Sequence, residues 1–162
     1  MKIGVYGGTF NPPHLGHVTA ARAVSELLKL DKLLFIPAGL PPHKPLPEGT
    51  PSPEQRLELI RRSVADLPNV EAELYSGLLA DYARQKGAGI LVKGVRNTTD
   101  FDLEYQQAAI NRGICPELET LLLPASPAYQ HFSSTMVREM IRYGQPLEKY
   151  VPAPVAEELK GR

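Results

Sequence analysis

The stretch "KIGVYGGTFNPPHLGHVTAARAVSELLKL" (residues 2–30) decides the fold, because it joins a short apolar run to a helix through a turn rich in glycine and proline. "KIGVY" is typical of a strand that is buried on both faces of a parallel sheet. In the segment 17–30, Val18, Ala21 and Val24 form an apolar stripe with helical spacing. The stretch therefore predicts a strand, a tight turn and an amphipathic helix.

The alternation of strands and helices continues along the chain. Further strands are predicted at 32–38, 69–75, 88–94 and 118–125, and further helices at 52–67, 76–87, 101–113, 133–144 and 152–161. Ser52 and Gln55 are expected to form a capping box. Asp100 is expected to cap the helix that follows it, and Gly87 to end another. We predict an α/β fold: a single Rossmann-like, doubly wound domain over residues 1–162 with a five-stranded parallel sheet.

The composition is that of a soluble, cytoplasmic protein. The 18 Lys and Arg residues balance 18 Asp and Glu residues, so the net charge gives no reason to expect a nucleic acid or a membrane as partner. The apolar runs are far too short to span a membrane. Cys115 is the one cysteine, which excludes an internal disulfide. Seven of the 16 prolines fall between Pro37 and Pro53 and predict one stiff, extended loop.

The first turn (residues 6–17) is predicted to bind an anion. Ligands of doubly wound sheets bind beyond the carboxyl ends of the strands, where the strand order reverses. Gly7 and Gly8 would let an anion approach the backbone, and the helix behind the turn would offer free N–H groups. His14 and His17 lie one helical turn apart and are expected to be neutral there, so each can donate an N–H toward the same phosphate.

Other interpretations of the first turn stay open. It could be a tight connection in which either histidine only caps the helix or packs in the core. The His-x-x-His spacing could also hold zinc, although no cysteine cluster or second histidine pair accompanies it. Neither the GxGxxG pattern of dinucleotide-binding folds nor the lysine motif of P-loop proteins follows the first strand. Phosphate binding is therefore the favoured interpretation.

A second phosphate-binding segment is predicted in "HFSSTMVREMIR" (131–142). Ser133, Ser134 and Thr135 stand at a predicted helix start, where hydroxyls and open backbone N–H groups can bind the outer phosphates of a nucleotide. The alternative is a serine that caps the helix and does nothing more.

Both segments resemble known signatures. "TFNPPHLGH" (9–17) is similar to the (T/H)xGH motif of the nucleotidyltransferase superfamily, which also includes the HIGH-type aminoacyl-tRNA synthetases. Together with "LFIPAGLPPHK" (34–44), it resembles nicotinate mononucleotide adenylyltransferases. The segments "KGVRNTTDFDLEYQQAAIN" (93–111) and "FSSTMVR" (132–138) resemble phosphopantetheine adenylyltransferases. The second resemblance is favoured, because its middle block is long, ordered and specific.

This resemblance implies an enzyme of coenzyme A biosynthesis. Such an enzyme transfers the adenylyl group of ATP to 4′-phosphopantetheine by direct in-line displacement and releases pyrophosphate, with Mg²⁺ on the triphosphate. The resemblance also implies a cytoplasmic homohexamer. Two alternatives stay open: nicotinate mononucleotide as the acceptor, and a nucleotide-binding regulator without catalysis.

The resemblance also implies roles for individual residues. His17 is the implied catalytic residue, which stabilises the transition state. The implied ATP contacts are Thr9, Phe10, His14, His17, Gly94, Val95, Arg96, Glu104, Tyr129, Gln130, His131, Phe132, Ser133, Ser134 and Thr135, and the implied acceptor contacts are Thr9, Lys44, Leu79 and Lys93. Two positions depart from the family pattern, since Lys93 replaces an arginine and Leu103 a tyrosine. Arg96 and Glu104 could instead form a surface ion pair.

Overall fold

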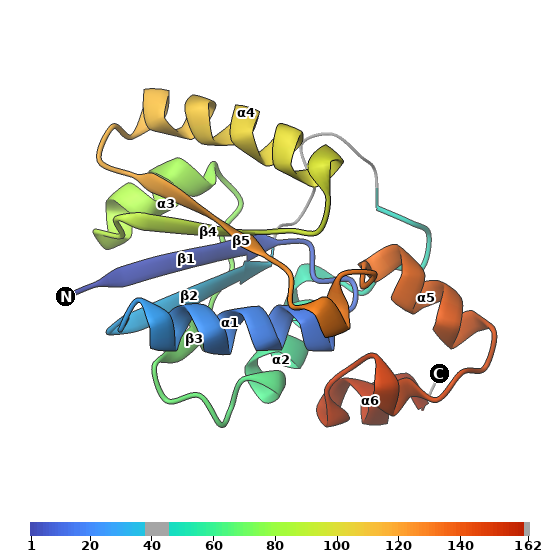
Figure 1. Cartoon of the computed structure of the whole chain (residues 1–162). Coiled ribbons are helices and arrows are strands. Elements are labelled where there is room, and N and C mark those ends of the chain that lie inside the picture. Colours follow the sequence, from blue (N-terminus) through green and yellow to red (C-terminus); the bar gives the residue numbers. More distant parts are fainter. Residues whose placement is uncertain (38–45, 161–162) are drawn as a thin grey trace.

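A parallel sheet forms the centre of the molecule (Figure 1). The computed structural model describes residues 1–37 and 46–160. Within them the strands are β1 (Ile3–Gly8), β2 (Lys32–Pro37), β3 (Val70–Ala72), β4 (Ile90–Val95) and β5 (Glu119–Pro124), in the order β3-β2-β1-β4-β5. All neighbouring strands run parallel. The strand order reverses between β1 and β4, so the predicted doubly wound fold with five parallel strands is confirmed.

Helices cover both faces of the sheet (Figure 1). The described helices are α1 (Leu15–Leu27), α2 (Pro53–Ser63), α3 (Leu79–Lys86), α4 (Thr98–Ile114), α5 (Ser134–Arg142) and α6 (Ala153–Lys160), with single 3₁₀ turns at Pro127–Tyr129 and Leu147–Lys149. Helices α1 and α2 pack on one face, and α3 with the end of α4 on the other. Helices α5 and α6 lie beyond the carboxyl ends of the strands. No helix among the described residues is long and apolar enough to cross a bilayer.

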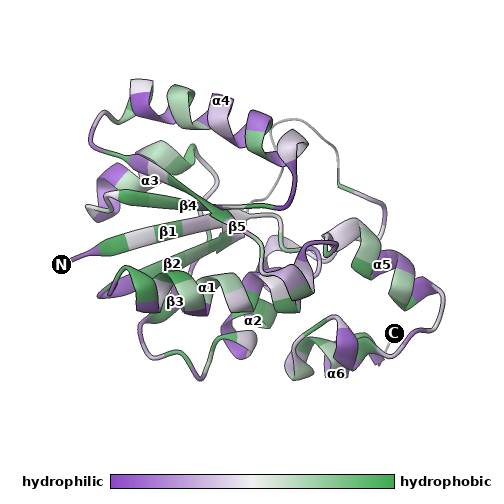
Figure 2. Ribbon diagram, viewed as in Figure 1, coloured by the Kyte–Doolittle hydropathy of each residue, from purple (hydrophilic) through white to green (hydrophobic). Residues whose placement is uncertain are grey.

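The strands divide their buried side chains between two cores. In β1, Val5 packs with α3 whereas Tyr6 packs with α1 and α2. In β2, Leu34 and Phe35 divide in the same way. Figure 2 shows the strands β2, β4 and β5 mainly in green and the purple, polar residues mainly on the helices. The continuous apolar runs of the sequence thus correspond to strands that are covered on both faces.

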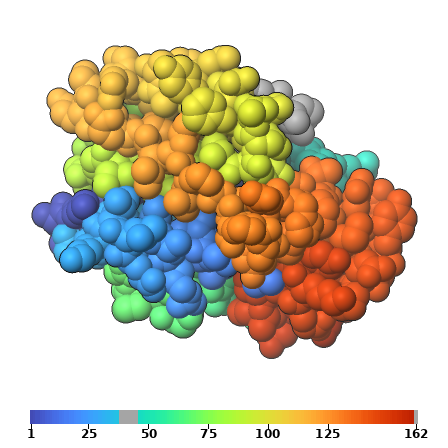
Figure 3. Space-filling view, viewed as in Figure 1, coloured from blue at the N-terminus to red at the C-terminus, as the bar shows by residue number. Residues whose placement is uncertain are grey.

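A third, smaller core attaches the end of the chain to the rest. Leu59 of α2, Val137 of α5 and Val155 of α6 belong to it. Nearby, the backbone N–H of Leu15 donates to the carbonyl of Tyr150 at 2.9 Å. In Figure 3 the blue residues from the start of the chain lie beside orange and red residues from its end. The C-terminal segment therefore contacts the start of α1, directly behind the first turn.

Most predicted helix ends are confirmed, but one cap is wrong. Ser52 and Gln55 form the expected capping box, and Gly87 ends α3 with a φ of +69°. Helix α4, however, begins at Thr98 instead of 101. Its cap is Asn97, whose side-chain oxygen accepts the N–H of Asp100 at 2.9 Å. Asp100 therefore lies inside the first turn of α4, which leaves its carboxylate available for another partner.

Several elements are shorter than the sequence predicts. Helix α2 ends at Ser63 instead of 67. Strand β3 covers three residues of the predicted 69–75; it lies at the edge of the sheet and pairs only with β2 among the described strands. Helix α3 begins at Leu79 instead of 76. The residues between β3 and α3 form a connection instead of extending either one.

Candidate active site

A cleft opens at the carboxyl ends of β1 and β4, where the strand order reverses. Its volume is about 510 Å³, which is typical of sites for small ligands. The predicted site residues that line it are Thr9, Phe10, His14, His17, Lys93, Gly94, Val95, Arg96, Glu104, Tyr129, Phe132, Ser133 and Ser134. The first turn, the end of β4, the start of α4 and the start of α5 thus meet where this fold binds ligands.

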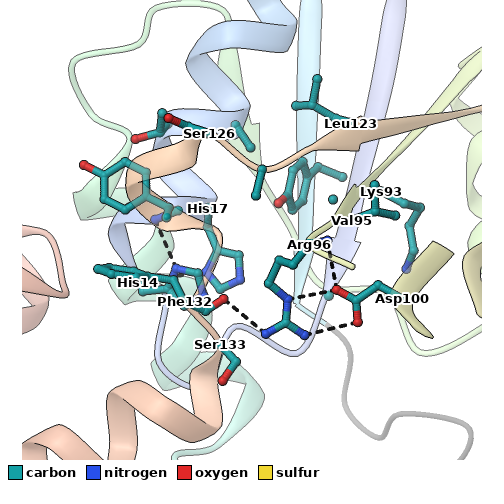
Figure 4. A pocket seen from close by; sticks show the side chains of 18 of the residues that line it. His14, His17, Lys93, Val95, Arg96, Asp100, Leu123, Ser126, Phe132 and Ser133 are labelled. Carbon is teal, nitrogen blue, oxygen red and sulfur yellow. Dashed lines mark hydrogen bonds and ion pairs between the residues drawn. The ribbon is translucent and has the colours of Figure 1, made fainter. Parts of the chain in front are cut away.

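The imidazoles of His14 and His17 line this cleft and stack on each other (Figure 4). Their ring centroids are 3.6 Å apart. The Nδ1 of His14 accepts the N–H of Gly16 at 3.1 Å, and the Nδ1 of His17 accepts the N–H of His14 at 3.0 Å. Because Nδ1 is the acceptor in both rings, the proton of each neutral imidazole is on Nε2. Each ring therefore keeps one N–H donor that the helix cap does not use.

Both imidazoles are neutral at physiological pH. Burial, together with the charge of Arg96, lowers the pKa of His14 to about 4. The pKa of His17 also lies well below its ordinary value, chiefly because of burial and then because of the charges of His14 and Arg96. The sequence predicts neutral rings from the positive end of the helix, and in the structure burial is the larger cause.

The backbone at the start of α1 is less open than the sequence predicts. The N–H of Leu15 donates to Tyr150, and that of Gly16 to the ring of His14. The N–H of His17 donates to the carbonyl of His14 at 3.1 Å. The prediction that this helix start offers free N–H groups to an anion is therefore wrong, because the capping box and the C-terminal segment use them. The donors that α1 offers to the cleft are imidazole groups.

The two glycines at the end of β1 make room for neighbouring side chains. A Cβ on Gly7 would overlap the end of the Leu79 side chain, and a Cβ on Gly8 would lie 3.1 Å from the ring of Phe10. Leu79 is at the start of α3 and belongs to the core beside that helix. It does not line the cleft. Its predicted contact with the acceptor is therefore not supported by its position.

Phe10 connects the first turn to His17. Its φ of +51° lies in the left-handed region, which costs a residue other than glycine about 1–3 kcal/mol. The ring is buried, 5.1 Å from the ring of Phe35, and its face meets His17 edge-on at 4.8 Å. Packing of this ring therefore holds both the unusual backbone of the turn and the orientation of the imidazole.

Arg96 bridges the cleft from the end of β4 to the segment before α5 (Figure 4). Its Nε and Nη2 donate to the carboxylate of Asp100 at 2.9 and 3.2 Å, and its Nη1 donates to the carbonyl of Phe132 at 3.2 Å. Glu104 instead faces Lys93, with 3.5 Å between Oε2 and Nζ. The alternative of an ion pair between Arg96 and Glu104 is therefore wrong: two separate pairs line the cleft.

The start of α5 keeps open backbone donors. The hydroxyl of Ser133 accepts the N–H of Met136 at 3.0 Å and caps the helix. The hydroxyl of Ser134 donates to the carbonyl of Pro12 at 3.3 Å, which ties α5 to the first turn. Within the described part of the chain, the N–H groups of Ser134 and Thr135 have no hydrogen-bond acceptor. Unlike the start of α1, the start of α5 therefore has amides left for an anion.

The other predicted site residues either do not line the cleft or lie outside the described residues. Gln130, His131 and Thr135 do not line the cleft. Lys44 lies outside the described residues. The cleft is also lined by Tyr6, Asp100 and Ser126, which the sequence does not single out as ligand contacts. Ser126 is the second residue after β5, so its place just beyond a parallel strand is a usable signal. Tyr6, inside a strand, gave no such signal.

The described residues contain no cluster of three or more potential metal-ligating side chains. The zinc alternative for the two histidines therefore has no support within residues 1–37 and 46–160. The carboxylates that line the cleft are Asp100 and Glu104, and each faces a cation. This arrangement does not offer a ready-made carboxylate site for Mg²⁺, and it fits an ion held by the phosphates of a nucleotide.

Comparison with known proteins agrees with this geometry. Residues 5–140 match the family model described as cytidylyltransferase-like. A phosphopantetheine adenylyltransferase of a Synechococcus species is 41% identical over 99% of this chain and 97% of its own length. The same-named proteins of Caldanaerobacter subterraneus and Rhizorhabdus wittichii are 36% and 38% identical, over 98% and 100% of this chain and 96% and 94% of theirs. The chain therefore belongs to the phosphopantetheine adenylyltransferase family, within the cytidylyltransferase-like proteins.

Proposed function

We propose that this protein transfers the adenylyl group of ATP to 4′-phosphopantetheine, which yields dephospho-coenzyme A and pyrophosphate. The relatives named phosphopantetheine adenylyltransferase cover nearly the whole chain and support this acceptor over nicotinate mononucleotide. The observation that carries the proposal is the pair of neutral imidazoles in the cleft at the switch point of the sheet. Two N–H donors at one place suit a phosphate group.

The reaction needs alignment more than proton transfer. The acceptor is a phosphomonoester with a second pKa of about 6, so it is largely a dianion at neutral pH. One of its oxygens attacks the α-phosphorus of ATP, and the bond from that phosphorus to the bridging oxygen of pyrophosphate breaks. No proton has to leave the nucleophile. The protein therefore has to hold two anionic groups in line and stabilise the charge that builds up on the α-phosphate.

His17 is the residue to which we assign this stabilisation. Its Nδ1 is occupied by the N–H of His14, which leaves Nε2–H as the donor to a phosphate oxygen. Because the pKa of the protonated ring lies well below its ordinary value, the imidazole is neutral at neutral pH and still carries the Nε2–H that it donates. His14 would act in the same way from the adjacent ring. The two rings replace the backbone amides that α1 does not supply.

The cations of the cleft would bind the remaining phosphate oxygens. We assign Lys93 to the acceptor phosphate and Arg96 to the outer phosphates of ATP. Both residues face carboxylates in the structure, Glu104 and Asp100 respectively. Phosphate oxygens would compete for these cations when substrate enters. The contact of Lys44 with the acceptor stays a prediction.

Mg²⁺ is part of the proposal as the partner of the triphosphate. A bound Mg²⁺ neutralises phosphate charge and polarises the P–O bonds. The protein's contribution is then the positioning of the nucleotide around it: the imidazoles toward the α-phosphate, and the start of α5 toward the outer phosphates.

The discriminating experiment offers the purified protein ATP and Mg²⁺ with either 4′-phosphopantetheine or nicotinate mononucleotide. Pyrophosphate release and product mass are measured side by side. We expect pyrophosphate and dephospho-coenzyme A in the first reaction and neither pyrophosphate nor dinucleotide in the second. Turnover of nicotinate mononucleotide alone would contradict the proposed acceptor. Binding of ATP without pyrophosphate from either mixture would support a regulator instead.

We also infer a homo-oligomer, with the hexamer of the resembled family as the expected state and the cytoplasm as its expected location. Helix α4 spans 17 residues and none of them is buried in the single chain. Phe101, Leu103, Tyr105 and Ile110 of this helix are exposed. Exposed apolar side chains on a helix that the single chain does not bury support self-association. Light scattering behind size-exclusion chromatography tests it, and a monomer at micromolar concentration would contradict it.

A further inference from the structure

The first turn is held from behind by a buried arginine. Arg56 of α2 is 1% exposed, and its Nη1 donates to the carbonyl of Thr9 at 2.7 Å. Its Nε donates at the same time to the carbonyl of Pro51 at 3.1 Å. Burial lowers the pKa of this guanidinium, which means that keeping the charge inside costs free energy. A buried arginine with this cost is expected to have a specific structural role.

A second arginine holds the other side of the same turn. Arg138 of α5 donates through Nη1 to the carbonyl of Asn11 at 2.6 Å and through Nη2 to the hydroxyl of Thr135 at 3.3 Å. The amide of Asn11 in turn donates to the hydroxyl of Thr50 at 3.1 Å. Arg56 and Arg138 line a common cavity of about 160 Å³ behind the turn. They therefore approach the turn from the side opposite to the cleft that receives substrate.

Phe10 has a strained backbone and lies between the carbonyls of Thr9 and Asn11 that the two arginines bind. Thr9 and Asn11 flank Phe10, whose φ is +51°. Arg56 thus bonds to the peptide group that precedes this left-handed residue, and Arg138 bonds to the peptide group between Asn11 and Pro12. The chain is therefore held on both sides of Phe10, which restricts the direction of its side chain. That side chain meets the imidazole of His17 at 4.8 Å. A path of direct contacts leads from Arg56 through Thr9 and Phe10 to the proposed catalytic ring.

We propose that Arg56 and Arg138 are positioning residues, which fix the first turn so that Phe10 holds the His17 imidazole in its reactive orientation. This inference rests on the proposed function for its kinetic readout only. Neither arginine has to touch substrate. The fork of the guanidinium is the feature that matters, because it binds two acceptors in one plane, which a lysine ammonium at the same site does not reproduce.

The first test compares Arg56→Lys with a matched control on the same helix. Arg61 of α2 donates through Nε and Nη2 to the carbonyl of Ala72 at 3.3 and 3.2 Å, far from the first turn in sequence. Arg61→Lys removes the same kind of bond without touching the turn. We expect Arg56→Lys to lower kcat about tenfold or more with less than a threefold change in the KM for ATP, because misplaced groups lose rate before affinity. The control should stay within twofold of the wild type.

A second readout does not depend on turnover. In ¹⁵N spectra of the imidazoles, the wild-type His17 should show a proton on Nε2 and a bare Nδ1. We expect Arg56→Lys to move these resonances and Arg61→Lys to leave them unchanged. If the wild type is inactive with every acceptor, the proposed function fails while the spectra still decide the positioning role.

Arg138→Lys repeats the test from the other side of the turn, with Arg142→Lys on the same helix as its control. Arg138→Lys also replaces Arg56→Lys as the test if the Arg56 variant does not fold, since Arg138 is less buried. The inference is overturned if both turn variants leave the His17 resonances in place. It is equally overturned if they change kcat no more than their controls do, or raise the KM for ATP with kcat unchanged.

Discussion

The rings of His14 and His17 stack at 3.6 Å, and each one accepts a backbone N–H through Nδ1. One local motif therefore caps the start of α1, selects the tautomer of both rings and presents two Nε2–H donors. Protonation of either Nδ1 would remove an acceptor of the cap and add a charge beside the other ring. The pair is a phosphate-binding device only while it is neutral.

The first prediction concerns stability between pH 7 and pH 5. The pKa of His14 is about 4 in the folded chain and near 6.5 in the unfolded chain, so the unfolded chain binds more protons in this interval. The stabilisation that comes from the lowered pKa of His14 is complete above pH 6.5 and is lost as the pH falls. His14 alone should lower the free energy of unfolding by about 2 kcal/mol at pH 5. Urea unfolding at both pH values measures it. His14→Asn should reduce the slope, and an unchanged slope would contradict the shifted pKa.

The second prediction is that His17→Ala lowers kcat by about 10²–10³, the usual effect of losing one transition-state donor. The circular dichroism spectrum should stay that of the wild type. Tyr143→Ala is the control, because Tyr143 is exposed and does not line the cleft. Wild-type turnover by the His17 variant would remove the proposed catalytic role.

The third prediction tests the stacked pair through a glycine. A Cβ on Gly16 would lie 2.9 Å from Cε1 of His14, so Gly16→Ala has to displace that ring. We expect about a tenfold fall in kcat, because the cap and the stack both depend on the ring. Gly113→Ala is the control, since a Cβ there meets nothing within 4 Å. The control should raise stability by up to about 1 kcal/mol and leave kcat unchanged. Equal kinetics in the two variants would show that the ring position is unimportant.

The fourth prediction concerns the acceptor. Lys93 stands where the family pattern has an arginine, and its Nζ lies 3.5 Å from Glu104. Lys93→Arg should lower the KM for 4′-phosphopantetheine by about three- to tenfold, because a guanidinium binds phosphate through two donors. The KM for ATP should change little. Lys149→Arg, an exposed lysine outside the cleft, is the control. A higher KM for the acceptor in the Lys93 variant would contradict the assignment of this residue.

Local patterns in the sequence predict most of the fold. The apolar run of β1 and the capping box of Ser52 each depend on neighbours within a few residues, and both are found as expected. Asp100 shows where local reasoning stops. A short carboxylate can cap a helix or bind a guanidinium, and only the path of the chain shows that Arg96 is in reach.

The site is predictable to the same degree. The residues that line the cleft were largely identified, because parallel strands bring their carboxyl ends together. The amides of α1 were misjudged, since Tyr150 is distant in sequence. The role of Arg56 was missed for the same reason: in the sequence it is one more charged residue of an amphipathic helix, and its burial depends on the tertiary structure.

The bond from Leu15 to Tyr150 has a consequence for synthesis on the ribosome. The imidazoles of His14 and His17 are translated well before Tyr150, whose carbonyl completes their helix start. A nascent chain therefore carries both imidazoles, Lys93 and Arg96 before this helix start is complete. Competence for catalysis should therefore arise only after the segment with Tyr150 has emerged and docked against α1.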